Sequence, residues 1–282
     1  MRPDTATVQI ERQEFNEYNY ITGLKNSSPT ELSNLGLTEQ EADLIVAEFE
    51  DALMTRALLP EDKLIAYGYS EEEIEILRSY AAGNDLSDSE LQSITATCST
   101  AIVNMGVTAN RAEFGYEWIW DQCPLVTLKD SAALCWNAYD ENNAANDVER
   151  YSVDAEIYYW NTDQNYSFMM EGEEEEGLPF NAVNIQFPLE YNHVGSGAIS
   201  YDCYAKSGKV YVTVVLPSGV TREIHHLFVS GLYGHTTVGL VFPSAGISQT
   251  GDLSISFSGN LSTESIGGKK ATLSGYNVSY WG

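Results

Sequence analysis

The sequence predicts an α+β protein, with a small N-terminal helical module over residues 1–91 and an antiparallel β-sandwich over residues 92–282. Three observations support this fold class. A segment with helix-start signals occurs twice at an offset of 32 residues. From Ser93 onward apolar and polar residues alternate with a period of two. The composition also shifts near residue 92, from Glu, Leu and Ala to Thr, Ser, Val, Tyr and Trp, which places a domain boundary at about 83–91.

The repeated segment contains a capping box in each copy. A hydroxyl side chain accepts from the backbone amide three residues on, and the Glu there reaches back to the cap amide. The pairs are Thr38 with Glu41 and Ser70 with Glu73. Gly36 and Gly68 precede the boxes and suit a turn with positive φ. We therefore predict helices at about 39–56 and 71–82, with shorter ones near 30–35 and 61–67.

Each copy reads Leu-x-x-x-Gly-[Leu/Tyr]-[Thr/Ser]-Glu and resembles small three-helix modules such as ubiquitin-associated domains. The resemblance covers about ten residues per copy. We expect each copy to be a helix-turn-helix packing unit. Recognition of ubiquitin is the less favoured alternative, because similarity in fold does not by itself imply the same function.

The alternating pattern predicts strands over the remaining two-thirds of the chain. The first three are expected at 94–102, 114–121 and 128–136, and further strands at about 151–160, 181–189, 197–206, 209–216, 221–229, 235–242, 253–258 and 271–281. Gly, Ser, Asn or Pro separate them, as at Ser207-Gly208 and Pro217-Ser218-Gly219. Many short strands without intervening helices indicate an antiparallel sandwich or barrel.

Charge excludes two classes of partner. The chain has 41 Asp and Glu against 14 Lys and Arg, a formal net charge of −27. This balance disfavours nucleic-acid phosphates and anionic membrane surfaces. No apolar run approaches the ~20 residues that a membrane-spanning helix needs. The charge is uneven: residues 1–91 carry −14, residues 92–176 carry −13, and residues 177–282 are neutral.

Four cysteines occur, and no Cys-x-x-Cys motif suggests a zinc site. Cys98 and Cys203 each fall on an apolar strand face, where either a cross-sheet disulfide or two buried thiols would fit. The polar start, Met1-Arg-Pro-Asp-Thr, indicates that this chain contains no signal peptide. The Ser, Thr, Asn and Tyr content, the few lysines and the acidity favour an extracellular or cell-surface protein.

Several segments together resemble uncharacterised secreted proteins of Gram-positive bacteria. They are Leu-x-x-x-Gly-Tyr-Ser-Glu-Glu-Glu-Ile followed by Ala96-Thr-Cys-Ser-Thr, then Trp118-Ile-Trp120-Asp-Gln-Cys-Pro124-Leu, Asp130-Ser-Ala-Ala-Leu-Cys-Trp136 and Tyr233-Gly-His235-Thr-Thr. The resemblance touches about a third of the chain. It implies secretion and a β-rich domain, and it supplies no catalytic residues.

Aromatic side chains are the main candidates for ligand binding. Trp118 and Trp120 follow Phe114 and Tyr116 on one strand face, which is either an exposed stacking platform for sugars or, as for most such stripes, core. Tyr158 and Trp160 share a strand face with Asp154 and Glu156. They are better candidates for an exposed surface that binds a ligand.

The sequence points to no metal and no cofactor. The run Glu171–Glu176 is acidic, but it lacks calcium-loop spacing and is expected to be a solvated loop. His225 and His226 point to opposite strand faces. One of them could meet His235 across the Ser230–Gly234 turn, which gives fewer ligands than zinc requires. His193 is the fourth histidine and is not assigned to a site.

No enzyme motif is evident, and a carboxylate pair for glycoside hydrolysis would first be sought among Asp121, Asp130, Asp154 and Glu156. The expected function is a secreted, non-enzymatic surface or interaction protein with a glycan or protein partner. The alternative is a carbohydrate- or cell-wall-binding module, or a glycosidase on a β-sandwich. A membrane-inserting β protein would need a longer hairpin than the alternating run at 253–258.

Overall fold

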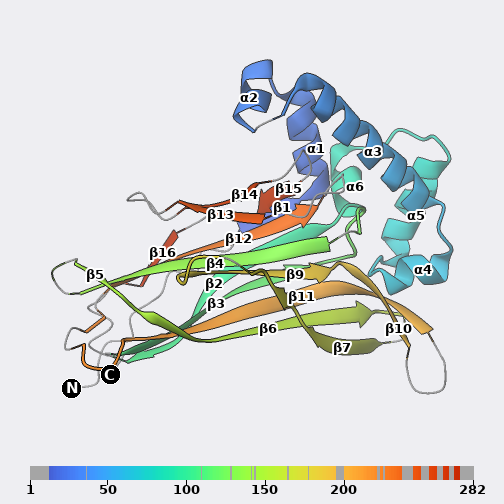
Figure 1. Ribbon diagram of the computed structural model, residues 1–282. Helices are drawn as coiled ribbons and strands as arrows, with labels where there is room; N and C mark the ends of the chain where they lie inside the picture. The colour runs from blue at the N-terminus through green and yellow to red at the C-terminus, as the bar shows by residue number, and fades with distance from the viewer. Residues whose placement is uncertain are drawn as a thin grey trace, which may run out of the picture.

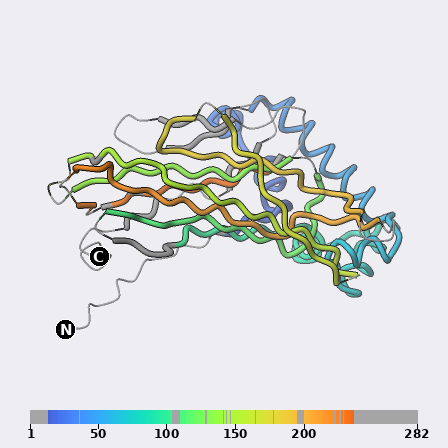
Figure 2. The backbone as a smooth tube through the Cα atoms, turned by 60° about the horizontal axis from the view of Figure 1, so that its bottom comes forward, coloured from blue at the N-terminus to red at the C-terminus, as the bar shows by residue number. Residues whose placement is uncertain are grey.

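The computed structural model describes residues 13–273, except positions 36, 109, 128, 141, 143, 164, 177, 195–199, 221–222, 225, 237–243, 249–253, 259–262 and 267–269. It contains helices and antiparallel sheets, so the α+β class is confirmed. Long strands run side by side, and the helices gather at one end of them (Figures 1 and 2).

The predicted helices are present with nearly the predicted bounds. They are α2 (Pro29–Asn34), α3 (Glu39–Ala57), α4 (Glu61–Ala66) and α5 (Glu71–Ala81). Both predicted capping boxes form, and two more start α2 at Ser28 and α6 at Ser87. Gly68 has a φ of +96°, as its turn requires. Gly36 lies outside the described residues.

Three elements before β2 were not predicted. Strand β1 (Gln13–Asn16) and helix α1 (Glu17–Asn26) precede the repeat, and α6 (Asp88–Ser93) lies where the domain boundary is expected. β1 pairs with β2 of the β-strand region, so the N-terminal segment contributes to a sheet. The division of the chain into domains at residues 1–91 and 92–282 stays a prediction.

Two sheets contain most of the strands. The first has the order β1, β2 (Thr97–Thr108), β3 (Arg111–Trp120), β11 (Ser200–Val215), β6 (Glu149–Asn161) and β7 (Tyr166–Glu171), with β10 (Glu190–Val194) also paired to β11. The second has the order β15 (Thr263–Ile266), β12 (His226–Thr236), β4 (Lys129–Tyr139), β9 (Ala182–Pro188) and β8 (Glu173–Glu174), with β16 (Lys270–Leu273) on β12 and β5 (Ala145–Asn146) on β4. β13 (Ser244–Ser248) and β14 (Ser254–Ser258) pair separately.

Two predicted turns are wrong, because β11 and β12 each run straight through them. Glycine in these strands makes room for an aromatic ring rather than a turn. A Cβ at Gly208 would lie 2.2 Å from the Trp118 ring, and one at Gly231 would lie 2.4 Å from the Tyr116 ring. The glycines therefore permit continuous strands to pack closely on the aromatic core.

The aromatic stripe of β3 lies in a buried core that includes residues of both sheets. Phe114, Tyr116, Trp118 and Trp120 are all at most 2% exposed. Trp118 stacks on Phe187 of the second sheet with ring centroids 5.1 Å apart. Of the two alternatives for this stripe, the structure shows the core, because all four side chains are buried in that cluster.

The helices have their own core, and it continues onto one end of the strands. Buried side chains of α1, α3 and α5 pack with Cys123, Leu125 and Tyr204. Arg56 of α3 is 5% exposed and donates to the backbone oxygens of Cys123 and Pro124 at 2.8 and 2.6 Å. These contacts fix the helices against the sheet end that carries the candidate site.

All four cysteines are buried and none of them forms a disulfide, so the disulfide alternative is not present. Cys98 and Cys203 lie on β2 and β11 of the same sheet with β3 between them, and this spacing explains why they do not form a cross-sheet bridge. Among the described residues no helix has the length and apolar character required to cross a membrane.

Candidate functional site

An open groove of about 490 Å³ crosses β2, β3, β11 and β6 on the first sheet. This volume lies within the range of about 300–1,000 Å³ that is typical of small-molecule sites. The lining mixes aromatic, apolar, hydroxyl and charged residues: Ser99, Thr100, Ala101, Glu117, Trp118, Ile119, Tyr158, Trp160, Ser207, Gly208 and Lys209.

Strand pairing arranges the outward side chains of the groove in rows across the sheet. One row contains Ser99, Ile119, Ser207 and Tyr158, and the next contains Ala101, Glu117, Lys209 and Glu156. Side chains alternate between the two faces of a strand, so the row between these two points to the core. Its members Thr100, Trp118, Gly208 and Ile157 are buried.

Lys209 is the centre of the groove's polar contacts. Its ammonium lies 2.9 Å from a Glu156 oxygen, 5.7 Å from the Tyr158 ring centroid and 5.0 Å from that of Tyr211. The Tyr158 hydroxyl donates to Glu156, and the Tyr211 hydroxyl donates to Glu117 at 3.1 Å. The groove is thus lined by paired charges and oriented rings.

These contacts change the pKa values of the group. The hydrogen bond from Tyr158, followed by that from Lys209, lowers the pKa of Glu156. The same carboxylate raises the pKa of Tyr158 and of Lys209. At neutral pH the groove therefore presents a carboxylate, an ammonium and a neutral phenol.

Trp160 lies at the end of the groove nearest the helices. It is partly buried and packs against the helical core. A strand irregularity between Ala205 and Ser207 leaves Lys206 as an extra residue, and its ammonium lies 5.5 Å from the Trp160 ring centroid. Burial lowers the pKa of Lys206.

The structure brings two of the four predicted ligand-binding residues together on the surface, Tyr158 and Trp160. Trp118 and Trp120 are not surface residues: they are 2% and 0% exposed and pack in the core. Trp118 borders the groove beneath Gly208, and Trp120 contacts Tyr233 and His235. The assignment of Trp120 to a ligand-binding surface is corrected, because it points to the inner face of β3 and does not line the groove, whereas Trp118 is buried and reaches the groove only at its border.

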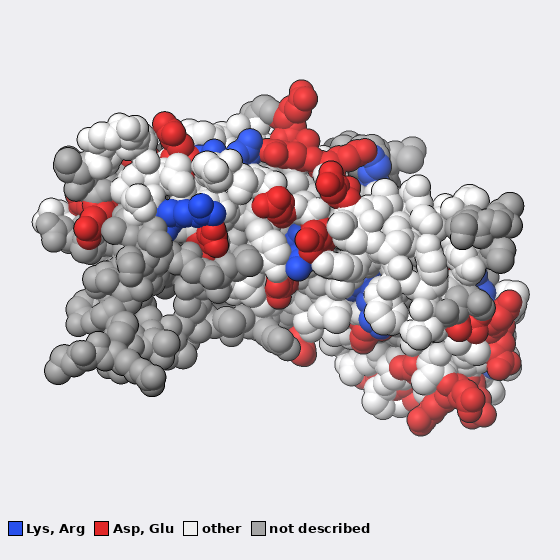
Figure 3. All heavy atoms as spheres, turned by 90° about the horizontal axis from the view of Figure 1, so that it is seen from below, with Lys and Arg blue, Asp and Glu red and all other residues white. Residues whose placement is uncertain are grey.

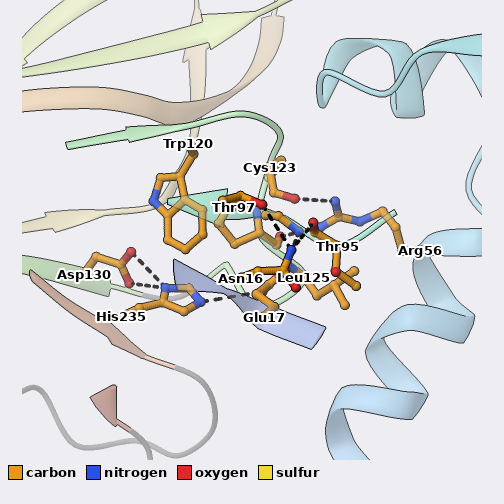
Figure 4. A network of polar contacts seen from close by, with 12 residues as sticks. Asn16, Glu17, Arg56, Thr95, Thr97, Trp120, Cys123, Leu125, Asp130 and His235 are labelled. Atoms are coloured by element: carbon orange, nitrogen blue, oxygen red, sulfur yellow. Dashed lines mark hydrogen bonds and ion pairs between the residues drawn. The ribbon is translucent and has the colours of Figure 1, made fainter. Parts of the chain in front are cut away.

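A second polar cluster lies in the interior (Figure 4). The His235 Nδ1 is 3.0 Å from Asp130 Oδ2, and its Nε2 is 3.7 Å from Glu17 Oε1. Tyr233 donates to Asp130 at 2.6 Å and accepts from the Trp120 indole at 3.0 Å. The backbone amides of Ala96 and Leu125 donate to Glu17 at 3.0 and 2.9 Å.

The interior cluster is charged and closed. Burial disfavours the imidazolium, but the charge of Asp130, its hydrogen bond and Glu17 outweigh burial and raise the pKa of His235 to about 10. His235, Asp130 and Glu17 are 0%, 1% and 4% exposed, so no ligand reaches them. The cluster instead joins the N-terminal segment to both sheets, and Asp130 is removed from the candidate catalytic carboxylates.

Of the remaining candidate carboxylates, Asp154 and Glu156 lie two residues apart on β6, and Asp121 follows the end of β3. Asp121 accepts from the backbone amides of Thr97 and Gln122 at 2.7 Å, and Asp154 is exposed on β6. Part of the acidic run forms edge strand β8, in which Glu174 pairs with Arg150, so a loop throughout this run is wrong. The described residues contain no group of three or more His, Cys, Asp or Glu that could hold a metal.

The histidine pair that the sequence suggested, across a turn at Ser230–Gly234, does not form among the described residues. The turn expected at Ser230–Gly234 is absent because β12 is continuous, so a His226–His235 contact across it is wrong. His225 lies outside the described residues. His193 lies on β10 within an aromatic group, 4.4 Å from the Phe168 ring centroid.

Sequence reasoning missed Lys209 and Glu117 of the groove and Glu17 of the interior cluster. The period-two pattern of β3 could have placed Glu117 on the polar face. No sequence signal places Lys209 between β3 and β6, because this depends on strand order and register.

Comparisons with known proteins show only weak structural similarity. No family model matches the sequence, and a search of curated proteins gives no match. Similar solved structures include one titled "AvmM Catalyzes Macrocyclization in Alchivemycin A Biosynthesis", at 11% identity and a TM-score of 0.26 over 62% of this chain and 87% of that one. A DUF4466 family protein from Parabacteroides merdae has 11% identity and a TM-score of 0.25, over 62% of this chain and 44% of that one. At these scores the similarities carry no functional weight.

Proposed function

We propose that this protein binds carbohydrate without catalysis, through the groove on the first sheet. The observation that carries the proposal is the position of Tyr158 and Trp160 in one open groove beside paired polar groups. Flat aromatic rings pack against the apolar faces of sugar rings, while hydroxyl, amide and charged groups bond to sugar hydroxyls.

The groove has the donors and acceptors that a polyhydroxy ligand needs. Ser99 and Ser207 supply hydroxyls, Glu117 and Glu156 supply acceptors, and Lys209 supplies a donor. The charges of Lys209 and Glu156 are paired, and Figure 3 shows basic side chains beside acidic ones over much of the face seen from below, with acidic ones predominating at its lower right. A balanced surface suits a neutral polyhydroxy ligand better than a strongly charged one.

The proposal also covers how the two sheets pack and where the protein is located. We propose that the two sheets form a β-sandwich, for which the shared core of Trp118, Phe187 and Tyr233 is support. We also propose an extracellular or cell-surface location. The polar composition and the resemblance to secreted proteins of Gram-positive bacteria support this location.

Retention on insoluble cellulose, chitin and purified bacterial cell walls tests the proposal, with tryptophan fluorescence as a second signal. We expect the protein to be retained on at least one of these solids. Tyr158→Ala and Trp160→Ala should each weaken retention about tenfold or more, since ring contacts dominate such sites.

Tyr151→Ala is the matched control, because Tyr151 is on the same strand, is 68% exposed and lies outside the groove. Circular dichroism should show that the variants remain folded. Absence of retention on all three solids, or equal retention of the groove and control variants, overturns the proposal. Release of soluble sugar that depends on Glu117 or Glu156 would overturn its non-catalytic part.

A further inference from the structure

Lys209 of β11 lies opposite a carboxylate on each of its two neighbouring strands. In the register of the first sheet its partners are Glu117 of β3 and Glu156 of β6. Side chains directly opposite each other have Cβ atoms about 4.5–5.5 Å apart, and opposite charges in such pairs attract each other. Both carboxylates are therefore placed to bind the same ammonium.

Only Glu156 binds it. Its carboxylate oxygen is 2.9 Å from the Lys209 ammonium, whereas none of the ion pairs among the described residues joins Lys209 to Glu117. Glu117 is partly buried, lines the groove and accepts from the Tyr211 hydroxyl at 3.1 Å. Tyr211 comes from the next outward row of β11, so a hydrogen bond between rows replaces the ion pair that the register offers.

Gly115 makes room for the Tyr211 ring. These two residues are opposite each other on β3 and β11. A Cβ at Gly115 would lie 2.5 Å from the Tyr211 Cδ1 atom and 2.8 Å from the Val210 carbonyl oxygen, closer than a Cβ atom packs. Glycine in a strand often marks such a close approach. The ring centroid is also 5.0 Å from the Lys209 ammonium, so the ring lies beside both charged groups.

We infer that Tyr211 is a positioning residue of the groove, which holds Glu117 away from Lys209 and leaves this carboxylate as an acceptor for hydroxyl groups of the sugar. The positioning role deepens the proposed carbohydrate binding and rests on it. The Tyr211 hydroxyl fills one acceptor position of Glu117, and a carboxylate has about four. Hydrogen bonds to an ionised acceptor are stronger than those between neutral groups, so an open Glu117 contributes to affinity and orients the ligand.

The variant Tyr211→Phe removes the hydroxyl and keeps the ring over Gly115. Glu117 is then expected to turn towards Lys209, because that ammonium is the cation directly opposite it on β11. The binding assay uses whichever of cellulose, chitin and bacterial cell walls retains the unchanged chain. We expect the retention of Tyr211→Phe to be about five- to tenfold weaker, as for the loss of one hydrogen bond to the ligand.

A second substitution separates positioning from damage to the fold. In Tyr211→Phe/Glu117→Gln the amide oxygen still accepts hydrogen bonds but carries no charge that would draw it to Lys209. We expect this double variant to bind at least about threefold better than Tyr211→Phe, because the two changes are coupled. The control Tyr211→Phe/Glu113→Gln removes the same charge from β3 outside the groove, where Glu113 pairs with Arg111, and should give no recovery.

Crystal structures of the unchanged chain and of Tyr211→Phe measure the position of Glu117 without a ligand. The Glu117 carboxylate should lie within about 4 Å of the Lys209 ammonium only in the variant. An unmoved Glu117, undiminished retention of Tyr211→Phe, or no recovery with Glu117→Gln overturns the inference, and weakened retention of Tyr158→Ala in the same assay would leave the proposed function standing. If the unchanged chain is retained on none of the three solids, the proposed function and the inference both fail.

Discussion

Two clusters of the molecule contain the same kinds of side chains and differ in exposure. The interior cluster combines Trp120 and Tyr233 with Asp130 and His235, and the groove combines Trp160 and Tyr158 with Glu156 and Lys209. His235 and Asp130 have fully buried side chains, whereas those of Lys209 and Glu156 are 28% and 35% exposed. Access to solvent, and not residue type, therefore separates a structural ion cluster from a candidate binding surface.

The largest expected effect comes from Asp130→Asn. This change keeps the shape of the side chain but leaves His235 without its nearer carboxylate. Removing one partner of a buried ion pair costs about 3–5 kcal/mol. We expect the free energy of unfolding, measured by urea titration, to fall by about that amount.

A double-mutant cycle with His235→Gln assigns the loss to the pair. The two changes should be non-additive, because each removes the same interaction. A fall below about 1 kcal/mol for Asp130→Asn would mean that the interior cluster behaves like an exposed pair.

The sequence predicts the two clusters unequally. Alternation along one strand is enough to place Tyr158 and Trp160 on the same face, and capping boxes are enough to start α3 and α5. Asp130 and His235 are 105 positions apart, and Glu17 comes from a segment with no helix-repeat signal. Contacts of this kind depend on which strands pair and in what register, and no local pattern encodes that information.

The pH dependence of stability tests the interior cluster directly. The folded-state pKa of His235 is raised to about 10, from about 6.5 in an unfolded chain. The imidazolium therefore stabilises the fold fully below pH 6.5, and this stabilisation is lost as the pH rises towards 10. We expect the free energy of unfolding to fall by at most about 1.4 kcal/mol per pH unit in that window.

The variant His235→Gln supplies the comparison for this measurement. Its unfolding free energy should lack the decline between pH 6.5 and 10 that the unchanged chain shows. Parallel profiles for the two proteins would show that His235 is neutral in the folded state.

The smallest expected effect is that of Glu156→Gln, the groove counterpart of Asp130→Asn. Because Glu156 and Lys209 are partly exposed, their ion pair contributes about 0–1 kcal/mol to stability, and urea titration should detect little change. The local electrostatics should nevertheless change. Glu156 raises the pKa of Tyr158, so its neutral replacement should lower that pKa, measured by tyrosinate absorbance against Tyr158→Phe. An unchanged tyrosine titration would separate Tyr158 from Glu156, and a loss of stability like that of Asp130→Asn would remove the distinction between the two clusters.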